Sequence, residues 1–194
     1  MTALRGCAAK LAVVCLLSGG QALAQSHWFN PANGHYYRFE SQVLTWEQAR
    51  MAAMQQSFAG VSGHLATITS AEEQAFLTAT PLLFQKYWLG GFQPPGSPEP
   101  DGNWQWITGE PFTYNNWPTP FEPNNRDGVE HLLEMFPGGF WNDVGTLEPF
   151  STPTNPQLTE RAYIVEFSVP EPARVFLVAC VALTMGLIRR KRRA

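Results

Sequence analysis

Apolar residues recur at helical spacing after Thr45 in the first third of the chain. Gln48 lies three residues after Thr45, and a Thr-x-x-Gln spacing is a capping box that begins an α-helix. An apolar stripe with a period near 3.6 residues faces the core of a folded domain. The residues expected on that stripe are Trp46, Ala49, Ala53 and Met54.

The same signal recurs at Ser70, which has Glu73 three residues further on. This pair predicts a second capping box and a second helix. Proline has no N–H for the helical hydrogen-bond ladder, so Pro81 limits the length of this helix.

Short aromatic and apolar runs bounded by Gly, Pro and Asn predict strands elsewhere in the chain. The expected strands cover residues 36–40, 64–68, 104–106, 132–136 and 162–169. Long Pro- and Asn-rich loops cover residues 94–103 and most of 117–143. Two early helices with several short strands indicate an α+β fold whose helices flank small antiparallel sheets.

Residues 1–24 have the three parts of a secretory signal peptide. Arg5 and Lys10 form the charged start, residues 11–17 the apolar centre, and residues 22–24 a small-x-small cleavage site. The apolar run is too short to span a bilayer, which argues against a membrane anchor. We therefore expect signal peptidase to remove this segment.

Residues 169–194 form a second segment of distinct composition. Pro170-Glu171-Pro172 precedes an apolar run at 175–188 and a basic cluster at 189–193. Fourteen helical residues span about 21 Å, against a hydrocarbon core of about 30 Å, so we expect transient insertion in the inner membrane with the basic end in the cytoplasm. The segment resembles the PEP-CTERM sorting tail of Gram-negative bacteria. That resemblance implies recognition by an exosortase and delivery to the cell surface or extracellular matrix; an ordinary tail anchor is the alternative.

The domain between these ends, residues 25–168, is acidic. Residues 25–171 hold sixteen Asp/Glu and five Lys/Arg, a formal charge of −11, whereas the basic ends bring the whole chain to −3. An acidic domain argues against binding to nucleic acid. The cysteines are Cys7, Cys15 and Cys180, so residues 25–168 have none for a disulfide, a zinc–thiolate site or a thiol nucleophile.

The candidate chemistry lies in the loop at 117–143, where Arg126 is the only Lys or Arg. Carboxylates that are brought together repel one another unless a cation joins them. Carboxylate and amide oxygens suit calcium better than zinc, and calcium takes six to eight oxygens. Positions left open would be filled by water or by hydroxyl groups of a ligand. The candidate ligands are Glu122, Asn124, Glu130, Asn142 and Asp143.

Taken in order, these pieces resemble a C-type lectin-like domain across nearly all of residues 25–168. The matching segments are 45–49, 63–68, 70–73, 88–91, 122–124, 141–143 and 163–166, together with Trp117 and Glu130. The resemblance implies a double-looped domain whose terminal strands pair. It also implies that the five candidate ligands above hold one calcium ion (Ca2+) and bind sugar through it.

The order Glu122-Pro123-Asn124 resembles the mannose-type subset of that family, which prefers vicinal equatorial hydroxyls. In this subset the hydroxyls complete the calcium shell, donate to Glu122 and Glu130, and accept from the amides of Asn124 and Asn142. The resemblance also implies a cis peptide bond before Pro123.

Two features depart from the family pattern. Its two disulfides are absent: Ala53 and Val165 stand near one pair of cysteine positions, and Leu132 and Thr146 near the other. Loss of a native disulfide costs roughly 2–5 kcal/mol in a small secreted domain. A second calcium site lacks suitable ligands, since it would fall at His131 and Gln93, and we expect a single strong site.

Alternative functions have weaker support. Trp141 is expected in the core rather than as a sugar platform. No G-x-S-x-G elbow is present, and calcium-bound carboxylates cannot easily donate a proton, so we expect no enzyme. The sequence therefore predicts a calcium-dependent carbohydrate-binding module. The alternative is a calcium-independent protein-binding or matrix-structural module on the same fold.

Overall fold

The computed structural model of the protein describes residues 27–80, 84–146 and 158–169. The expected signal peptide and nearly all of the expected sorting tail lie outside these residues. Within the described residues, no helix combines the length and apolar character needed to cross a membrane.

The two ends of the domain meet in an antiparallel strand pair. Strand β2 (Tyr36–Leu44) pairs with β10 (Arg161–Phe167), with Phe39 opposite Ile164. This is the terminal pairing that the family resemblance implied. The short strand β1 (Trp28–Phe29) extends the sheet on the other side of β2.

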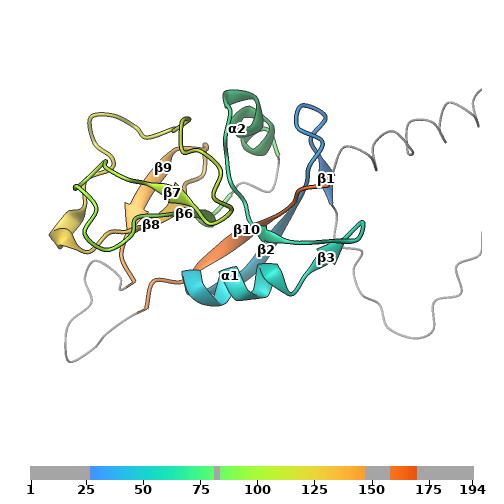
Figure 1. Ribbon diagram of the computed structural model, residues 1–194, viewed down its shortest axis with the longest axis horizontal. Coiled ribbons are helices and arrows are strands. Elements are labelled where there is room, and N and C mark those ends of the chain that lie inside the picture. The colour runs from blue at the N-terminus through green and yellow to red at the C-terminus, as the bar shows by residue number, and fades with distance from the viewer. Residues whose placement is uncertain (1–26, 81–83, 147–157, 170–194) are drawn as a thin grey trace, which may run out of the picture.

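Strand β10 joins this pair to the rest of the sheet. It pairs antiparallel with β5 (His64–Leu65) and parallel with β6 (Tyr87–Phe92). The sheet is therefore mixed, whereas the sequence predicted antiparallel sheets. Strand β6 pairs with β7 (Gln105–Trp106) and with β8 (Leu132–Met135), and β8 pairs with β9 (Trp141–Val144). Strands β6 to β9 and their long loops gather at the left end in Figure 1, and β1 lies towards the right. The hairpin of β3 (Ser57–Phe58) and β4 (Val61–Ser62) forms a separate small sheet.

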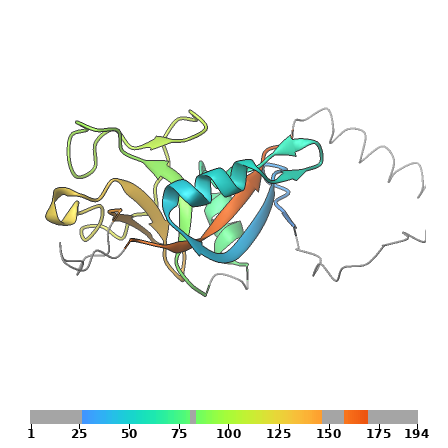
Figure 2. The same ribbon diagram turned by 90° about the horizontal axis from the view of Figure 1, so that it is seen from below.

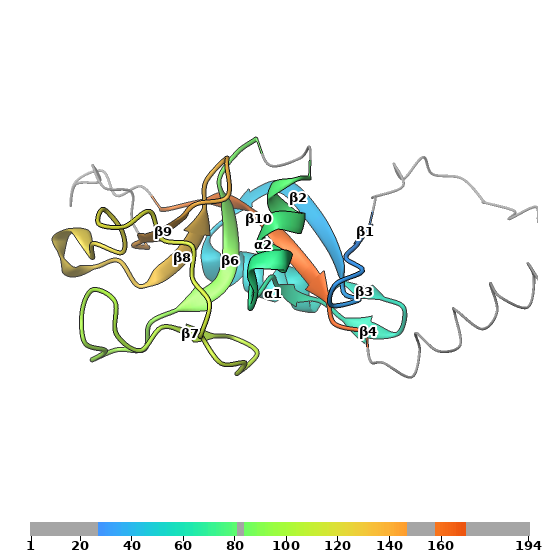
Figure 3. The same cartoon turned by 90° about the horizontal axis from the view of Figure 1, so that it is seen from above.

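The two helices cover opposite sides of the β2–β10 pair. Helix α1 (Trp46–Met54) lies in front of the pair in Figure 2, and helix α2 (Ala71–Thr78) in front of it in Figure 3. The alternation along β10 fits this arrangement. Ile164 belongs to the buried cluster that contains Leu77 of α2, and Val165 to the cluster that contains Ala49 and Ala53 of α1.

Both helices begin after the predicted capping residues, but one of the two capping boxes differs from the prediction. Thr45 forms the full capping box with Gln48, as predicted. Ser70 accepts a hydrogen bond from the Glu73 backbone N–H at 3.1 Å, but the Glu73 carboxylate accepts from the Thr69 N–H instead of returning to Ser70. The second capping box is therefore only half formed, because the Glu73 side chain belongs to a buried network.

Two other predictions need correction. Met54 is 54% exposed and does not face the core. It follows the buried Ala49 by five positions, which places it about 140° around the helix from that residue. Residues 141–144 form strand β9, although the polar Asn142 and Asp143 favoured a loop.

The predicted apolar replacements for one disulfide pack together. Ala53 and Val165 lie in the same buried cluster. Gly63 makes this approach possible, since a Cβ there would lie 2.5 Å from Val165 Cγ1 and 2.8 Å from the Ala53 carbonyl oxygen. At the other missing bridge, Leu132 is partly buried against this cluster and Thr146 is exposed.

Candidate functional site

Aromatic side chains that pack on the core anchor both ends of the acidic loop. The Trp117 ring lies edge-on to Trp141 at 5.5 Å and 5.2 Å from Trp104. Trp141 is fully buried, and its Nε1–H donates to Gln74 Oε1 at 2.8 Å. Trp141 is thus a core residue, as predicted, and it fixes the start of β9 against helix α2.

Asp143 holds the Glu-Pro-Asn turn onto strand β9. Its carboxylate is fully buried and accepts hydrogen bonds from the backbone N–H groups of Asn124 at 3.1 Å and Asn125 at 2.7 Å. The peptide bond between Glu122 and Pro123 is cis, as the family resemblance implied. These contacts bring residues 122–125 against a strand some twenty residues further along the chain.

Glu130 closes the other side of the loop. Its side chain is 6% exposed, and its Oε2 accepts from the Arg126 N–H at 2.8 Å. In return, the Glu130 N–H donates to Asn125 Oδ1 at 3.0 Å. The backbone of Asn125 and Asp127 is left-handed, a conformation that Asn and Asp adopt more readily than other side chains do. This turn (Arg126–Gly128) places Glu130 beside Glu122 and Asp143.

Burial, together with neighbouring carboxylates, raises two pKa values at the site. Burial, Asp143 and Glu130 raise the pKa of Glu122 to about 8, although the Asn124 amide, which donates to Glu122 Oε2 at 2.6 Å, opposes the shift. Burial and the charges of Asp143 and Glu134 raise the pKa of Glu130 to about 7, against the Arg126 N–H. Negative charge is therefore costly here, which is the electrostatic condition that favours a bound cation.

Asn142, the fifth predicted ligand, contacts a carboxylate that sequence reasoning did not include. Its Nδ2 donates to Glu134 Oε1 at 3.0 Å, and Glu134 is fully buried. Glu134 also contacts Lys86 Nζ at 3.1 Å and Arg161 Nε at 2.5 Å. Arg126 is thus the only Lys or Arg within residues 117–143, but the fold brings Lys86 and Arg161 from distant segments to Glu134 in this part of the chain.

The structure therefore brings Glu122, Asn124, Glu130 and Asp143 together, while Asn142 lies next to Asp143 on β9 with its side-chain nitrogen against Glu134. Asn124 is exposed, Glu122 and Asn142 are half-buried, and Glu130 and Asp143 are buried. The three carboxylates do not converge as tightly as one other group. Among the described residues, His35, Glu73 and Glu166 form the one group of three His, Cys, Asp or Glu whose ligand atoms all lie within 4.8 Å.

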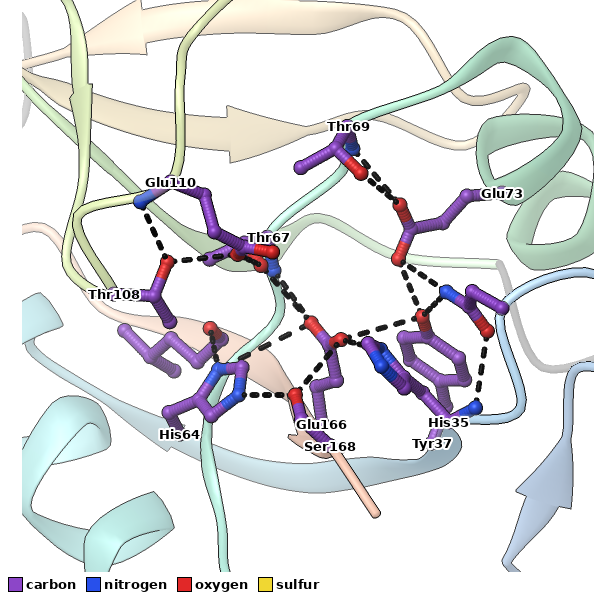
Figure 4. A network of polar contacts seen from close by, with 12 residues as sticks. His35, Tyr37, His64, Thr67, Thr69, Glu73, Thr108, Glu110, Glu166 and Ser168 are labelled. Atoms are coloured by element: carbon purple, nitrogen blue, oxygen red, sulfur yellow. Dashed lines mark hydrogen bonds and ion pairs between the residues drawn. The ribbon is translucent and has the colours of Figure 1, made fainter. Parts of the chain in front are cut away.

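This second group belongs to a buried polar network between helix α2 and the β2–β10 pair (Figure 4). Glu166 on β10 is 1% exposed; its Oε1 lies 2.5 Å from His35 Nδ1, and its Oε2 accepts from the Thr67 N–H at 2.9 Å. Glu73 on α2 accepts from the Tyr37 hydroxyl and is 2% exposed. The network thus joins β2, β10 and α2.

Sequence reasoning missed this network because it assigned Glu73 to a helix start and His35 to no role. Burial opposes protonation of His35, but the hydrogen bond to Glu166 and the charges of Glu166 and Glu73 outweigh it and raise its pKa. Burial and the charge of Glu166 raise the pKa of Glu73. His64 contacts the Leu65 carbonyl and the Ser168 hydroxyl, each at 3.0 Å.

Gln93 and His131, the two positions at which a second calcium site would fall, are neighbours, because the Gln93 N–H donates to the His131 carbonyl at 2.9 Å. Gln93 is 4% exposed, and its Nε2 donates to the carbonyls of Pro100 and Gly102 in the 94–103 loop. The His131 side chain is half-exposed, with its Nδ1 at 3.8 Å from Glu99. Gln93 therefore supports the loop backbone.

The fold defines a class: an α+β domain with paired terminal strands and a long loop rich in oxygen ligands. Comparison with known families matches residues 42–151 to the Lectin C-type domain. The match covers more than half of the chain, and the chain belongs to this family of lectins.

Known proteins agree with this assignment. The chain is 33% identical over 114 residues to C-type lectin domain family 17, member A, from Homo sapiens, which covers 59% of this chain and 27% of that protein. It is 33% identical over 107 residues to pulmonary surfactant-associated protein D from Bos taurus, covering 55% and 27%. It is 37% identical over 81 residues to halomucin from Haloquadratum walsbyi, covering 42% and 1%. The match thus spans about a quarter or less of each of these relatives.

Solved structures share the fold. The EPNH mutant of the lectin CEL-I has a TM-score of 0.57 at 22% identity, covering 76% of this chain and 97% of that one. The cow C-type carbohydrate-recognition domain of CD23, solved in the presence of GlcNAc2Man3 oligosaccharide, has a TM-score of 0.52 at 26% identity, covering 70% and 89%. A calcium-independent type II antifreeze protein has a TM-score of 0.51 at 24% identity, covering 68% and 85%.

Proposed function

We propose that this domain binds carbohydrate through one calcium ion held by Glu122, Asn124, Glu130, Asn142 and Asp143. The observation that carries the proposal is the gathering of Glu122, Asn124, Glu130 and Asp143, with Asn142 next to Asp143 on β9, at a place where burial and neighbouring carboxylates raise two carboxyl pKa values. Family membership supports the carbohydrate, and the oxygen-only donor set supports calcium. We infer no catalytic activity.

The chain's own residues fit such an ion. Three carboxylates and two amides supply hard oxygen ligands, and the backbone N–H groups of Asn124, Asn125 and Arg126 hold two of the carboxylates in place. Calcium, when bound, would offset the carboxylate charge and accept sugar hydroxyl oxygens in its shell. Glu122 and Asn124 lie on the more exposed side, where a sugar can approach.

The order of residues 122–124 supports a mannose- or glucose-type ligand with vicinal equatorial hydroxyls. Glu122 would accept a hydrogen bond from one hydroxyl, and the Asn124 amide would donate to the other. The CD23 domain, which was solved in the presence of a GlcNAc2Man3 oligosaccharide, supports this class of ligand.

Retention on mannose resin tests the proposal. We expect binding in millimolar calcium, release by a chelator, and loss of at least tenfold in affinity for Glu130→Gln. Asp127→Asn is the matched control, because it removes one charge from the same loop at an exposed side chain outside the ligand set. Retention that a chelator does not change would refute the calcium mechanism.

A double substitution tests the class of sugar. Glu122→Gln with Asn124→Asp reproduces the galactose-type order and is expected to shift preference from mannose towards galactose while calcium still binds. Unchanged preference in the double variant would show that residues 122 and 124 do not select the hydroxyl pattern.

A calcium-independent protein-binding or matrix-structural role is the second candidate. One observation favours it: Asp143 and Glu130 already accept backbone hydrogen bonds, so the loop has internal support of its own. A glycan array without calcium-dependent signal, together with a protein pull-down that survives chelation, would favour this role.

We also propose that the domain is exported, from the signal-like residues 1–24 and the PEP-CTERM-like residues 169–194. Signal peptidase would release the N-terminal segment, and an exosortase would process the tail after its transient insertion in the inner membrane. Mass spectrometry of the surface-shed protein is expected to find both segments removed. Recovery of full-length chain in the membrane would instead indicate an ordinary tail anchor.

A further inference from the structure

A pocket of about 470 Å³ lies beside the start of helix α1. Its walls include Trp46 of α1, Leu132 at the start of β8, and Leu158 and Thr159 just before β10. Sites for small organic molecules are typically clefts of roughly 300–1,000 Å³. The pocket is therefore large enough for such a ligand.

The pocket lies where the family pattern places one of its disulfides. Leu132 and Thr146, which stand near that pair of cysteine positions, both line it. The Thr159 N–H donates to the Thr146 carbonyl at 3.0 Å, so a backbone hydrogen bond holds these two segments together. Part of the wall thus consists of side chains that replace a covalent bridge.

The lining favours an uncharged and largely apolar ligand. Leu158 is 56% exposed, and Trp46 and Leu132 are only partly buried, so apolar surface meets water here. Covering such surface is favourable. Glu47, the charged residue of the lining, is paired with Arg50 at 2.6 Å. A charged ligand would therefore lose its hydration without gaining a free partner.

The hydroxyl of Thr159 is an unpaired polar group in this lining. Thr159 is 1% exposed, and its Oγ1 has no hydrogen-bond partner among the described residues. By contrast, Thr45 and Gln48, which also line the pocket, bond to each other in the capping box of α1. A buried hydroxyl without a partner costs free energy, which a hydrogen bond to a ligand would recover.

We propose that this pocket binds a small uncharged molecule with an apolar body, of the size of a benzene ring, and one hydroxyl group that pairs with the Thr159 hydroxyl. The Trp46 ring would form a wall for the apolar body. Its Nε1–H donates to the Leu89 carbonyl at 2.8 Å, which fixes the orientation of the ring. The five candidate ligands of the acidic loop do not line the pocket, so this site is separate from the proposed calcium site.

Benzyl alcohol is the probe for the first test, and toluene, which has the same ring without a hydroxyl, is its matched control. NMR titration of the full chain is expected to show saturable binding of one equivalent at millimolar concentration, in calcium and in chelator alike. Intermolecular NOEs should join the ring protons of benzyl alcohol to the methyl groups of Leu132 and Leu158. An absence of saturable binding, or NOEs to other parts of the protein alone, would overturn the proposal.

The second test removes the unpaired hydroxyl. Thr159→Val is expected to weaken binding of benzyl alcohol about fivefold and to change binding of toluene by less than twofold, because only the alcohol loses a hydrogen bond. Thr146→Val, which removes an exposed hydroxyl from the same lining, should leave both affinities unchanged. Without a probe, Thr159→Val should melt no lower than the unaltered chain, because no internal hydrogen bond is lost.

Equal effects of Thr159→Val on the two probes, or a lower melting temperature of the variant alone, would overturn the pairing with Thr159. None of these measurements depends on calcium or sugar. Their failure would therefore leave the proposed function standing, and a failure of sugar binding would leave the pocket standing.

Discussion

At the scale of single residues, close packing of α1 against β10 stands in place of one of the family's disulfides. Ala53 on α1 and Val165 on β10 belong to one buried cluster, and Gly63 leaves the space in which they pack. A methyl group at residue 63 would meet the Ala53 carbonyl, which is backbone and cannot turn aside. The side chain at this position is therefore restricted to hydrogen.

Gly63→Ala is accordingly expected to destabilise the domain by about 1–3 kcal/mol through overpacking. Urea unfolding at fixed calcium concentration would measure the loss. Ser62→Ala is the matched control, since Ser62 is the exposed neighbour in β4 and should change stability by less than about 0.5 kcal/mol. If Gly63→Ala were as stable as the control, α1 and β10 would be able to move apart at this point without a loss of stability.

At the scale of elements, the buried network of Figure 4 joins helix α2 to the β2–β10 pair. Two carboxylates, Glu73 and Glu166, are almost fully buried there, and the partly buried rings of His35 and His64 lie beside Glu166. Because the pKa values of His35 and Glu73 are both raised on folding, the folded domain binds these protons more tightly than the unfolded chain does. The network therefore contributes most to the free energy of unfolding at acid pH.

We expect the calcium-free domain to lose stability as the pH rises, from about pH 4.5 upward through Glu73 and from about pH 6.5 upward through His35. Urea unfolding in chelator between pH 5 and 9 would measure this slope, and His35→Gln should flatten its upper part. His131→Gln, at a half-exposed histidine outside the network, should leave the slope unchanged. Equal slopes for all three proteins would show that His35 does not carry a proton in the folded state.

At the scale of the whole molecule, the distribution of charge matters more than its total. Residues 25–171 carry −11 against −3 for the chain, and Glu122, Glu130 and Asp143 lie together at one end of the domain. No cysteine lies within residues 25–168 to offset the repulsion with a covalent bond. A bound divalent cation would therefore contribute directly to the stability of the fold.

We expect calcium to bind with one equivalent and to stabilise the domain by about 2.7 kcal/mol at a concentration of 100 times its Kd. For a domain of this size, that corresponds to a rise in Tm of roughly 10 °C. Isothermal titration and thermal melting would measure both quantities, and Glu130→Gln should abolish both. Saturation at two equivalents would contradict the single site, and no binding at millimolar calcium would favour the calcium-independent role.

The sequence by itself determined the helices, the class of fold and the candidate ligand set. Local signals were sufficient for these predictions. Thr45 and Ser70 cap helices through residues three positions further on. Trp117, Glu122, Glu130 and Trp141 follow one another along the chain at a spacing that can be recognised without the structure. Only the tertiary structure decided the ion cluster around Glu134 and the network around Glu166. Lys86, Glu134, Asn142 and Arg161 come from four strands or their edges, as His35, Glu73 and Glu166 come from three elements. No local pattern marks such residues, because the burial and pairing that define their chemistry exist only after distant strands have found their register.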